Sequence, residues 1–327
     1  MKTSIFGFLT AITFVSLMFY GCTNTIDLNN GNLPQSETPA FKTHVYGVLP
    51  MTADQYLNIP LYSKEVFETG LILKSATARV PVYTLATPPV RNQGQIGSCT
   101  AFCGAEVVEI LYYYKNNKSW TKVLSPAFIY YCERVLIEKW DIKIDQGAPM
   151  VDIPKALQKY GDCFESSYPY PDSNTSIAYT TAPTKSAMAE GLKYRIGQSK
   201  FSYAMIPSDD IEAVKNILRN DVPVMMAFNV FDDPDSTPLA YPYFERLNTT
   251  NYTYNPLTKK GDLVAGAILL GGHAVPIVGY DDNRKAFLCQ NSWSLSWGNK
   301  GFFYMPYSVF MSKIIVTPGS VFYATLR

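Results

Sequence analysis

The segment 271–306 constrains the fold more than any other part of the chain. Apolar residues alternate through Val275 and Ile277, the turn sequence Asp-Asp-Asn follows at 281–283, and a second apolar run begins at 286. Alternation on both sides of a turn is typical of an antiparallel hairpin. We therefore expect two strands here that return on each other.

A helix is predicted nearer the N-terminus. After the glycine-containing loop 94–97, Ala101, Ala105 and Val108 recur at spacings of three and four. This period predicts a helix with Cys99 in its first turn. Unpaired N–H groups and the helix dipole favour an anion there, which would shift the thiol towards thiolate. Taken alone, a buried and inert cysteine is the commoner interpretation.

Composition limits the classes of protein that fit. The chain has 327 residues, 47% of them hydrophobic, which suffices for one large or two small domains. An aromatic content of 14% excludes disorder as the main state. With 28 Lys and Arg against 27 Asp and Glu, the chain lacks the basic footprint of a nucleic-acid-binding protein.

The first 21 residues resemble a bacterial lipoprotein signal. Lys2 precedes an uncharged apolar run at 5–19, which is shorter than a comfortable membrane span and is followed by Gly21 and Cys22. Cys22 would be acylated and become the new N-terminus, while an uncleaved anchor or an ordinary signal remain alternatives. We expect an extracytoplasmic protein held by lipid on a membrane surface, at the periplasmic face or the cell surface.

A histidine and an amide stand at useful positions in the predicted hairpin. The chain has only two histidines, and His44 precedes the part expected to fold, so His273 is the one candidate partner for Cys99. A lone strand histidine is usually structural, but glycines just before it let backbone approach closely. Asn291 follows His273 on the returning strand, where its amide can meet the imidazole.

Together these stretches resemble the papain family of cysteine peptidases. The shared pattern, in the family's order, is Gln93, Gly97-Ser98-Cys99, His273 and Asn291-Ser292-Trp293. The resemblance covers about residues 79–310. It implies an α+β fold of two lobes, a helical left lobe and a right lobe of antiparallel barrel-like sheet, with 79–327 as the catalytic domain.

The resemblance also implies roles for four residues. Cys99 would be the nucleophile, paired as thiolate with an imidazolium at His273, and would form a thioester acyl-enzyme. Asn291 would orient the imidazole, and Gln93 would donate to the oxyanion. No cofactor and no metal are implied.

Four further positions are assigned to substrate binding. Gly147 would pair with substrate backbone, and Trp293 would cover the contact between histidine and asparagine. Gly272 and Ala227 would form the main specificity pocket, which would take a bulky apolar or aromatic side chain. The chain departs from the family pattern at Thr100, where a Trp is usual, and at Ile96, where a Cys is usual.

Four cysteines are left without a role: Cys103, Cys132, Cys163 and Cys289. Three full pairings are open to them. We expect a Cys132–Cys163 bond, with four free thiols as the alternative.

Two regions have no clear counterpart in the family. His273 follows Cys99 by 174 residues (273 − 99), against roughly 130–150 in papain-like enzymes. We place the excess in 231–266, as a loop at the cleft rim that favours short or end-specific substrates. Residues 22–78 would be a tether followed, from 41, by a spacer packed on the surface, with a short cleft-blocking propeptide as the alternative.

The sequence therefore predicts a thiol-dependent peptidase acting on peptides or proteins, monomeric and without nucleic-acid partners. Two alternatives stay open. One is a catalytically silent, lipid-anchored binding protein, and the other is an exopeptidase, amidase or transpeptidase that uses the same acyl-enzyme.

Overall fold

The computed structural model describes residues 44–70, 79–171, 181–232 and 244–326. All of them belong to one compact unit, Pro39–Arg327. The predicted signal at 1–21, Cys22 and the tether as far as residue 43 lie outside the described residues. Within the described residues, no helix has the length and apolar character needed to cross a membrane.

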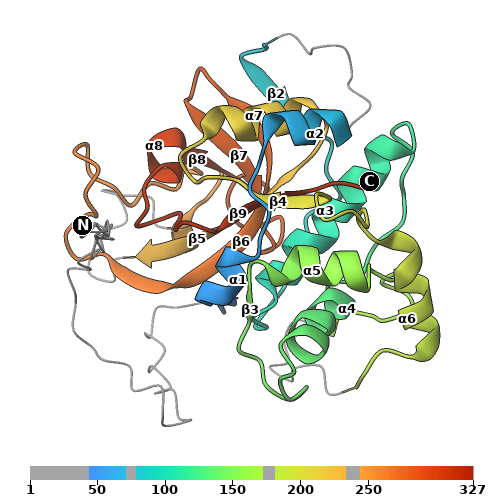
Figure 1. The fold of residues 1–327 in the computed structure, drawn as a ribbon. Helices are drawn as coiled ribbons and strands as arrows, with labels where there is room; N and C mark the ends of the chain where they lie inside the picture. The colour runs from blue at the N-terminus through green and yellow to red at the C-terminus, as the bar shows by residue number, and fades with distance from the viewer. Residues whose placement is uncertain (1–43, 71–78, 172–180, 233–243, 327) are drawn as a thin grey trace, which may run out of the picture. The chain divides into compact units, whose positions relative to one another are not determined.

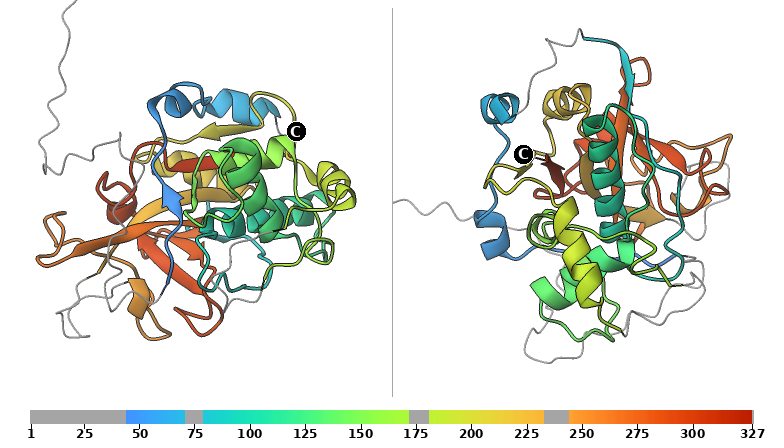
Figure 2. Two further views of the ribbon diagram at one scale, coloured as in Figure 1. Left: turned by 90° about the horizontal axis from the view of Figure 1, so that it is seen from below. Right: turned by 90° about the vertical axis from the view of Figure 1, so that its right-hand side faces the viewer.

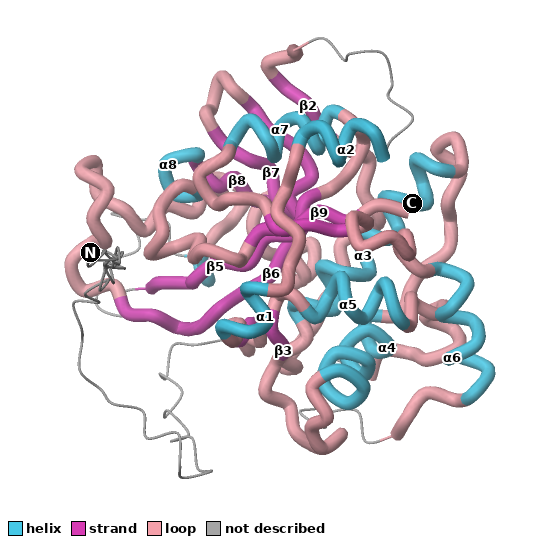
Figure 3. Tube along the Cα trace, viewed as in Figure 1, coloured by secondary structure: helices cyan, strands magenta, loops and turns pink. Residues whose placement is uncertain are grey.

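A long central helix, α3 (Cys99–Lys115), starts where the sequence predicts. It is buried on almost every side from Cys99 to Tyr112, because it packs against strand β6 on one side and helices α4 and α5 on the other. The remaining helices are α1 (Ala53–Leu57), α2 (Lys64–Gly70), α4 (Pro126–Tyr131) continued by the π-helical η1 (Cys132–Ile137), α5 (Asp152–Lys159), α6 (Lys185–Gly191), η2 (Leu192–Tyr194), α7 (Ile211–Arg219), η3 (Phe244–Arg246) and α8 (Tyr307–Phe310). Figure 3 shows α4, α5 and α6 together on one side of the molecule, while most strands lie on the other side with α1, α2, α7 and α8 around them. Figure 2 (right) gives a second view of the same arrangement.

One sheet collects the described strands (Figure 1). The strands are β1 (Val48–Leu49), β2 (Val82–Thr84), β3 (Ala148–Pro149), β4 (Tyr203–Met205), β5 (Val224–Asp232), β6 (Ile268–Asp281), β7 (Ala286–Gln290), β8 (Phe302–Pro306) and β9 (Val321–Ala324). Their order is β3-β1-β6-β5-β9-β4, with β2 and β7 also paired to β6 and β8 paired to β7. The α+β class is confirmed.

The predicted hairpin is strands β6 and β7. Tyr280 pairs with Phe287 and Asp281 with Ala286, antiparallel. Pro276 cannot donate to a ladder, and the pairing with β7 ends at Ile277, next to an irregularity in register. This hairpin fixes the geometry of the site, because it carries a histidine on one strand and places an asparagine directly after the other.

The expected Cys132–Cys163 bond is wrong. The five described cysteines, Cys99, Cys103, Cys132, Cys163 and Cys289, are all free and buried. Each thiol packs in the core as a small apolar side chain, so the surrounding core is held together without a disulfide. The alternative of four free thiols holds.

Candidate active site

Cys99 is the first residue of α3 and is completely buried. The loop before it is fixed by hydrogen bonds: the Ser98 hydroxyl lies 2.6 Å from the Tyr170 hydroxyl, and Tyr170 donates to the Gln93 carbonyl at 2.9 Å. The N-cap side chain makes no capping bond to the helix. The start of the helix is therefore held in place. Because no side chain caps it, the positive end of the helix dipole acts on the Cys99 thiol.

His273 lies on β6, with its ring held on one edge. Its Nε2 lies 2.7 Å from Oδ1 of Asn291, which also accepts the Ser292 backbone N–H at 2.9 Å. Burial lowers the His273 pKa from 6.5 to about 4. Its Nδ1 is buried and has no hydrogen-bond partner. The predicted hairpin contact thus forms, and one ring nitrogen stays available.

Helix α3, which begins at Cys99, packs on strand β6, which carries His273. Burial raises the Cys99 pKa to about 11, although backbone N–H groups of Ala274 and Gly47 directed at the sulfur lower it. The thiol therefore lies beside the residue that follows the histidine. With one pKa raised and the other lowered, both groups are neutral at pH 7, and the ion pair is not formed in this state.

The side-chain amide of Gln93 points at the loop that precedes Cys99. Its Nε2 donates to the Ile96 carbonyl at 3.0 Å and to the Val45 carbonyl at 3.3 Å. The Ser292 hydroxyl donates to Oε1 of Gln93 at 2.6 Å and fixes which end of the amide points inward. This side chain already binds a carbonyl oxygen from another part of the chain.

That carbonyl belongs to residues 44–51, which we call the cleft segment. Figure 2 (left) shows this blue stretch running between the sheet and the helices. Val48 pairs antiparallel with Gly272 of β6 and parallel with Ala148 of β3. The segment therefore lies between the two sides of the molecule, directly over Cys99, rather than on an outer surface.

Gly147 and Gly272 line one side of Cys99, where backbone meets backbone. Ala148 donates to the Gly47 carbonyl at 2.8 Å. Gly147 has a φ of +86°, and a Cβ on it would come within 2.0 Å of the Gly47 oxygen. A Cβ on Gly272 would come within 2.9 Å of Val48. Side chains are excluded at both positions because the cleft segment passes so close.

Ala227 lies on the same side, on β5 opposite Ala274 of β6. Together with Gly272 and Met150 it lines a cavity of about 610 Å³. Residues 48–51 of the cleft segment line the same cavity. The two predicted pocket residues are thus brought together, next to a strand of the chain's own N-terminal region.

Trp293 lies on the other side of Cys99, in an aromatic group. Its ring is 4.9 Å from that of His273 and 5.0 Å from that of Phe244. The imidazole of His44 stacks on it at 3.7 Å with the planes 8° apart. Sequence reasoning placed His44 outside the fold, and a single histidine beside a two-residue strand gives no periodic signal.

Glu245 was also missed, and it holds the cleft segment beside Trp293. Its carboxylate lies 3.1 Å from Nδ1 of His44 and accepts the Tyr46 hydroxyl at 2.5 Å. Its side chain is 5% exposed. It lies within 231–266, and the described part of that stretch does reach the active-site region.

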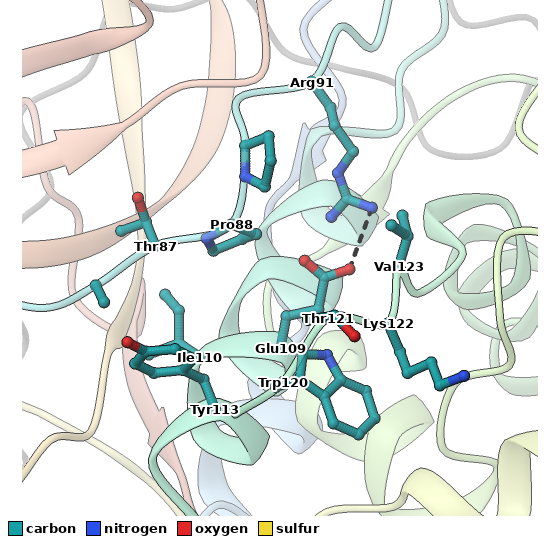
Figure 4. Close-up of a pocket in the computed structure, with 12 residues that line it drawn as sticks. Thr87, Pro88, Arg91, Glu109, Ile110, Tyr113, Trp120, Thr121, Lys122 and Val123 are labelled. Atoms are coloured by element: carbon teal, nitrogen blue, oxygen red, sulfur yellow. Dashed lines mark ion pairs between the residues drawn. The ribbon is translucent and has the colours of Figure 1, made fainter. Parts of the chain in front are cut away.

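A second cavity, of about 390 Å³, lies away from this site (Figure 4). It is bounded by the stretch 86–91, by the later turns of α3 and by residues 120–123. Arg91 pairs with Glu109 at 3.5 Å, and Glu109 accepts the Leu124 N–H at 2.7 Å. These contacts anchor the loop that leads to Gln93. Among the described residues, no group of His, Cys, Asp and Glu could hold a metal ion.

A thiol at a helix start and an imidazole that an amide orients, on two elements that pack together, are features of cysteine peptidases. The profile described as papain family cysteine protease matches residues 76–237 and 253–317. The chain belongs to this family. The unmatched gap lies inside the stretch 231–266, where we placed the excess length.

Two curated relatives illustrate the similarity. An uncharacterized peptidase C1-like protein of Acanthamoeba polyphaga mimivirus is 30% identical over 217 residues, 66% of this chain and 63% of that protein. Mouse cathepsin K is 27% identical over 250 residues, 76% of this chain and 63% of that protein. The chain thus spans less than two thirds of the length of these relatives.

Solved structures share the fold. Xylellain, a cysteine protease from Xylella fastidiosa, has 26% identity and a TM-score of 0.68, with 88% of this chain and 97% of that chain covered. Digestive procathepsin L2 from Tenebrio molitor has 21% identity and a TM-score of 0.60, with 87% and 79% covered. The second likeness shows the fold alone. The papain-like α+β fold predicted from the motifs is confirmed.

Proposed function

We propose that this chain is a thiol-dependent peptidase that hydrolyses peptide bonds through a Cys99 thioester. The observation that carries the proposal is the His273–Asn291 contact, which leaves the buried Nδ1 of His273 without a hydrogen-bond partner, while the next residue, Ala274, directs its N–H at the Cys99 thiol. A protein that had kept only the fold would not need an imidazole oriented in this way.

The reaction would proceed by acyl transfer. Once the cleft is open to water, the desolvation that keeps both groups neutral is relieved, and a proton passes from Cys99 to His273. The thiolate attacks the substrate carbonyl, whose oxygen takes the place of the Val45 oxygen at Nε2 of Gln93 and receives a second N–H from Cys99. His273 then protonates the leaving amine and later activates the hydrolytic water.

We further propose that the cleft segment keeps the peptidase latent until it is removed or displaced. The segment directs the Gly47 N–H at the Cys99 sulfur, and burial keeps this thiol protonated at neutral pH by raising its pKa to about 11. Attack on the segment itself is therefore disfavoured in this arrangement. The short-propeptide alternative for this region fits such a placement better than a surface spacer does.

The test is to incubate purified protein with an electrophilic cysteine-peptidase inhibitor and to map the adduct by mass, before and after the segment is trimmed by limited proteolysis. We expect labelling at Cys99 to be slow before trimming and fast after it, and peptide cleavage only after trimming. A Cys99→Ser variant should give neither, while the buried thiol variant Cys103→Ser should behave as wild type. Trimmed protein with no adduct and no cleavage would favour the silent binding alternative.

The N-terminal region supports a separate proposal about location. We propose that Cys22 is lipidated and holds the enzyme on an extracytoplasmic membrane surface, on the strength of the apolar run and the Gly21-Cys22 pair. Detergent phase partitioning of the full chain tests this. Wild type should enter the detergent phase and Cys22→Ser should stay in the aqueous phase. Equal partitioning of the two would contradict lipidation.

A further inference from the structure

Next to Trp293 and Glu245, the cleft is filled by a planar side chain from the same protein, the imidazole of His44. The His44 imidazole lies flat on the Trp293 indole, 3.7 Å away and 8° from parallel. The same imidazole reaches one oxygen of Glu245 at 3.1 Å. The Tyr46 hydroxyl donates to the other oxygen at 2.5 Å. The cleft segment thus places a flat ring and two hydrogen-bond donors against Trp293 and Glu245, and we call the space that these groups fill the recess.

The buried Glu245 carboxylate requires hydrogen-bond donors such as those of His44 and Tyr46. Its side chain is 5% exposed, and the neighbouring Phe244 ring packs against Trp293 and Trp297 at 5.0 and 4.8 Å. A carboxylate in aromatic surroundings is costly unless hydrogen bonds compensate the lost water. When the cleft segment leaves, the carboxylate loses the hydrogen bonds from His44 and Tyr46 together. A ligand that returns both will be favoured over one that returns neither.

The chemistry of the recess selects one side chain above the others. A guanidinium is planar, stacks on an indole, is always charged and presents a fork of donors that matches both oxygens of a carboxylate. A lysine ammonium supplies charge without the plane, and an acidic side chain would be repelled. Arginine reproduces in one group the stacking by His44 and the two hydrogen bonds to Glu245.

The position of the recess decides which substrate residue it receives. The cleft segment passes from Trp293 at His44, over Cys99 at Gly47, to Gly272 at Val48. Gly147 and Gly272 are the glycines that the family resemblance assigns to substrate binding. If the acyl part of a substrate lies along them, the recess faces the leaving part. We infer that Trp293 and Glu245 bind the side chain that follows the scissile bond and select arginine there, an inference that rests on the proposed peptidase activity.

Internally quenched peptides test the inference. The peptides keep the acyl part constant and vary the residue after the scissile bond among arginine, citrulline, lysine, alanine and glutamate. Citrulline has the shape of arginine without its charge. With trimmed enzyme we expect kcat/KM for arginine to exceed that for citrulline by about tenfold or more, the usual scale for a charge-assisted hydrogen bond.

Variants identify the group responsible. Glu245→Gln should bring the arginine to citrulline ratio close to one, and Glu245→Arg should favour glutamate over arginine. Glu212→Gln is the matched control, because Glu212 is a 56% exposed carboxylate on α7. It should leave the ratio as in wild type. An arginine preference that survives Glu245→Gln, or one found on the acyl side, would overturn the inference.

A binding measurement keeps this inference separate from the peptidase proposal. Calorimetry with trimmed Cys99→Ala protein compares the arginine and citrulline peptides without any turnover. If trimmed wild-type protein cleaved none of the peptides, the peptidase proposal would be wrong, while tighter binding of the arginine peptide would still support the recess. Equal binding of the arginine and citrulline peptides would contradict the selection of arginine by the recess, whether or not the enzyme cleaves the peptides.

Discussion

The two sides of Cys99 recognise a chain in different ways. On the glycine side, Gly147 and Gly272 meet the cleft segment through backbone, at approaches that leave no room for a Cβ. On the tryptophan side, Trp293 and Glu245 hold side chains, through a stacked ring and a buried carboxylate. Backbone contacts accept any sequence, whereas side-chain contacts select one. Backbone affinity for extended chains should come from the first side, and selection of the residue after the scissile bond from the second.

The largest effect should come from displacing the cleft segment at Gly47, where it passes over Cys99. In Gly47→Val, the added Cβ would lie 1.8 Å from the Gly97 carbonyl oxygen, so the segment cannot sit in the cleft. Desolvation of Cys99 would then be relieved, and its rate of alkylation at pH 7 should rise at least roughly hundredfold. Leu57→Ala, at a 78% exposed position on α1, is the control. An unchanged rate in Gly47→Val would show that the segment does not block the thiol.

Substitution on the glycine side should lower activity equally for any residue after the scissile bond. In Gly272→Val, the added Cβ lies 2.9 Å from where Val48, and later a substrate, pairs with β6. A misfit of about 2 kcal/mol corresponds to a fall in kcat/KM of roughly thirtyfold. Measured in the Gly47→Val background, the fall should be equal for peptides with arginine and with alanine after the scissile bond. A fall in kcat/KM confined to one of these two peptides would show that the glycine side also selects the residue after the scissile bond.

The pH dependence of alkylation should differ between closed and open forms. In the closed form burial raises the Cys99 pKa to about 11, so the proton stays on sulfur at neutral pH. The alkylation rate should therefore rise about tenfold for each pH unit up to that value. In Gly47→Val, with an imidazolium as partner, the rate should change little between pH 6 and 8. Mass mapping of Cys99 adducts across this range gives both profiles, and a flat profile in wild type would contradict a desolvated thiol.

The parts of the site that sequence predicted are those with periodic or local signals. Cys99 begins a helix whose apolar positions recur with helical period, and Asn291 follows His273 at the distance that one hairpin returns. The fold class followed from the same motifs. Local patterns suffice here because α3 and β6 are long and largely buried, and β7 follows β6 after a short turn.

The parts that sequence missed depend on contacts between distant residues. His44 and Glu245 are 201 residues apart, and Val48 belongs to a two-residue strand that exists only because β3 and β6 flank it. Nothing local distinguishes Glu245 from other charges in a polar, turn-rich stretch. The expected disulfide failed for a related reason, because spacing along the chain carries no information on how close two sulfur atoms lie.

The smallest effect should come from removing one side-chain contact on the tryptophan side. His44→Ala takes away the stacked ring and one hydrogen bond to Glu245, which together contribute about 1 kcal/mol at a position that stays partly solvated. The closed form should weaken by roughly fivefold, seen as a matching rise in Cys99 alkylation at pH 7. Tyr46→Phe, which loses only the other hydrogen bond to Glu245, should give a similar or smaller rise. The rise should be far below that of Gly47→Val, because the backbone pairing of Val48 with Gly272 and Ala148 remains intact. Equal effects of His44→Ala and Gly47→Val would mean that side chains, and not backbone, hold the segment in place.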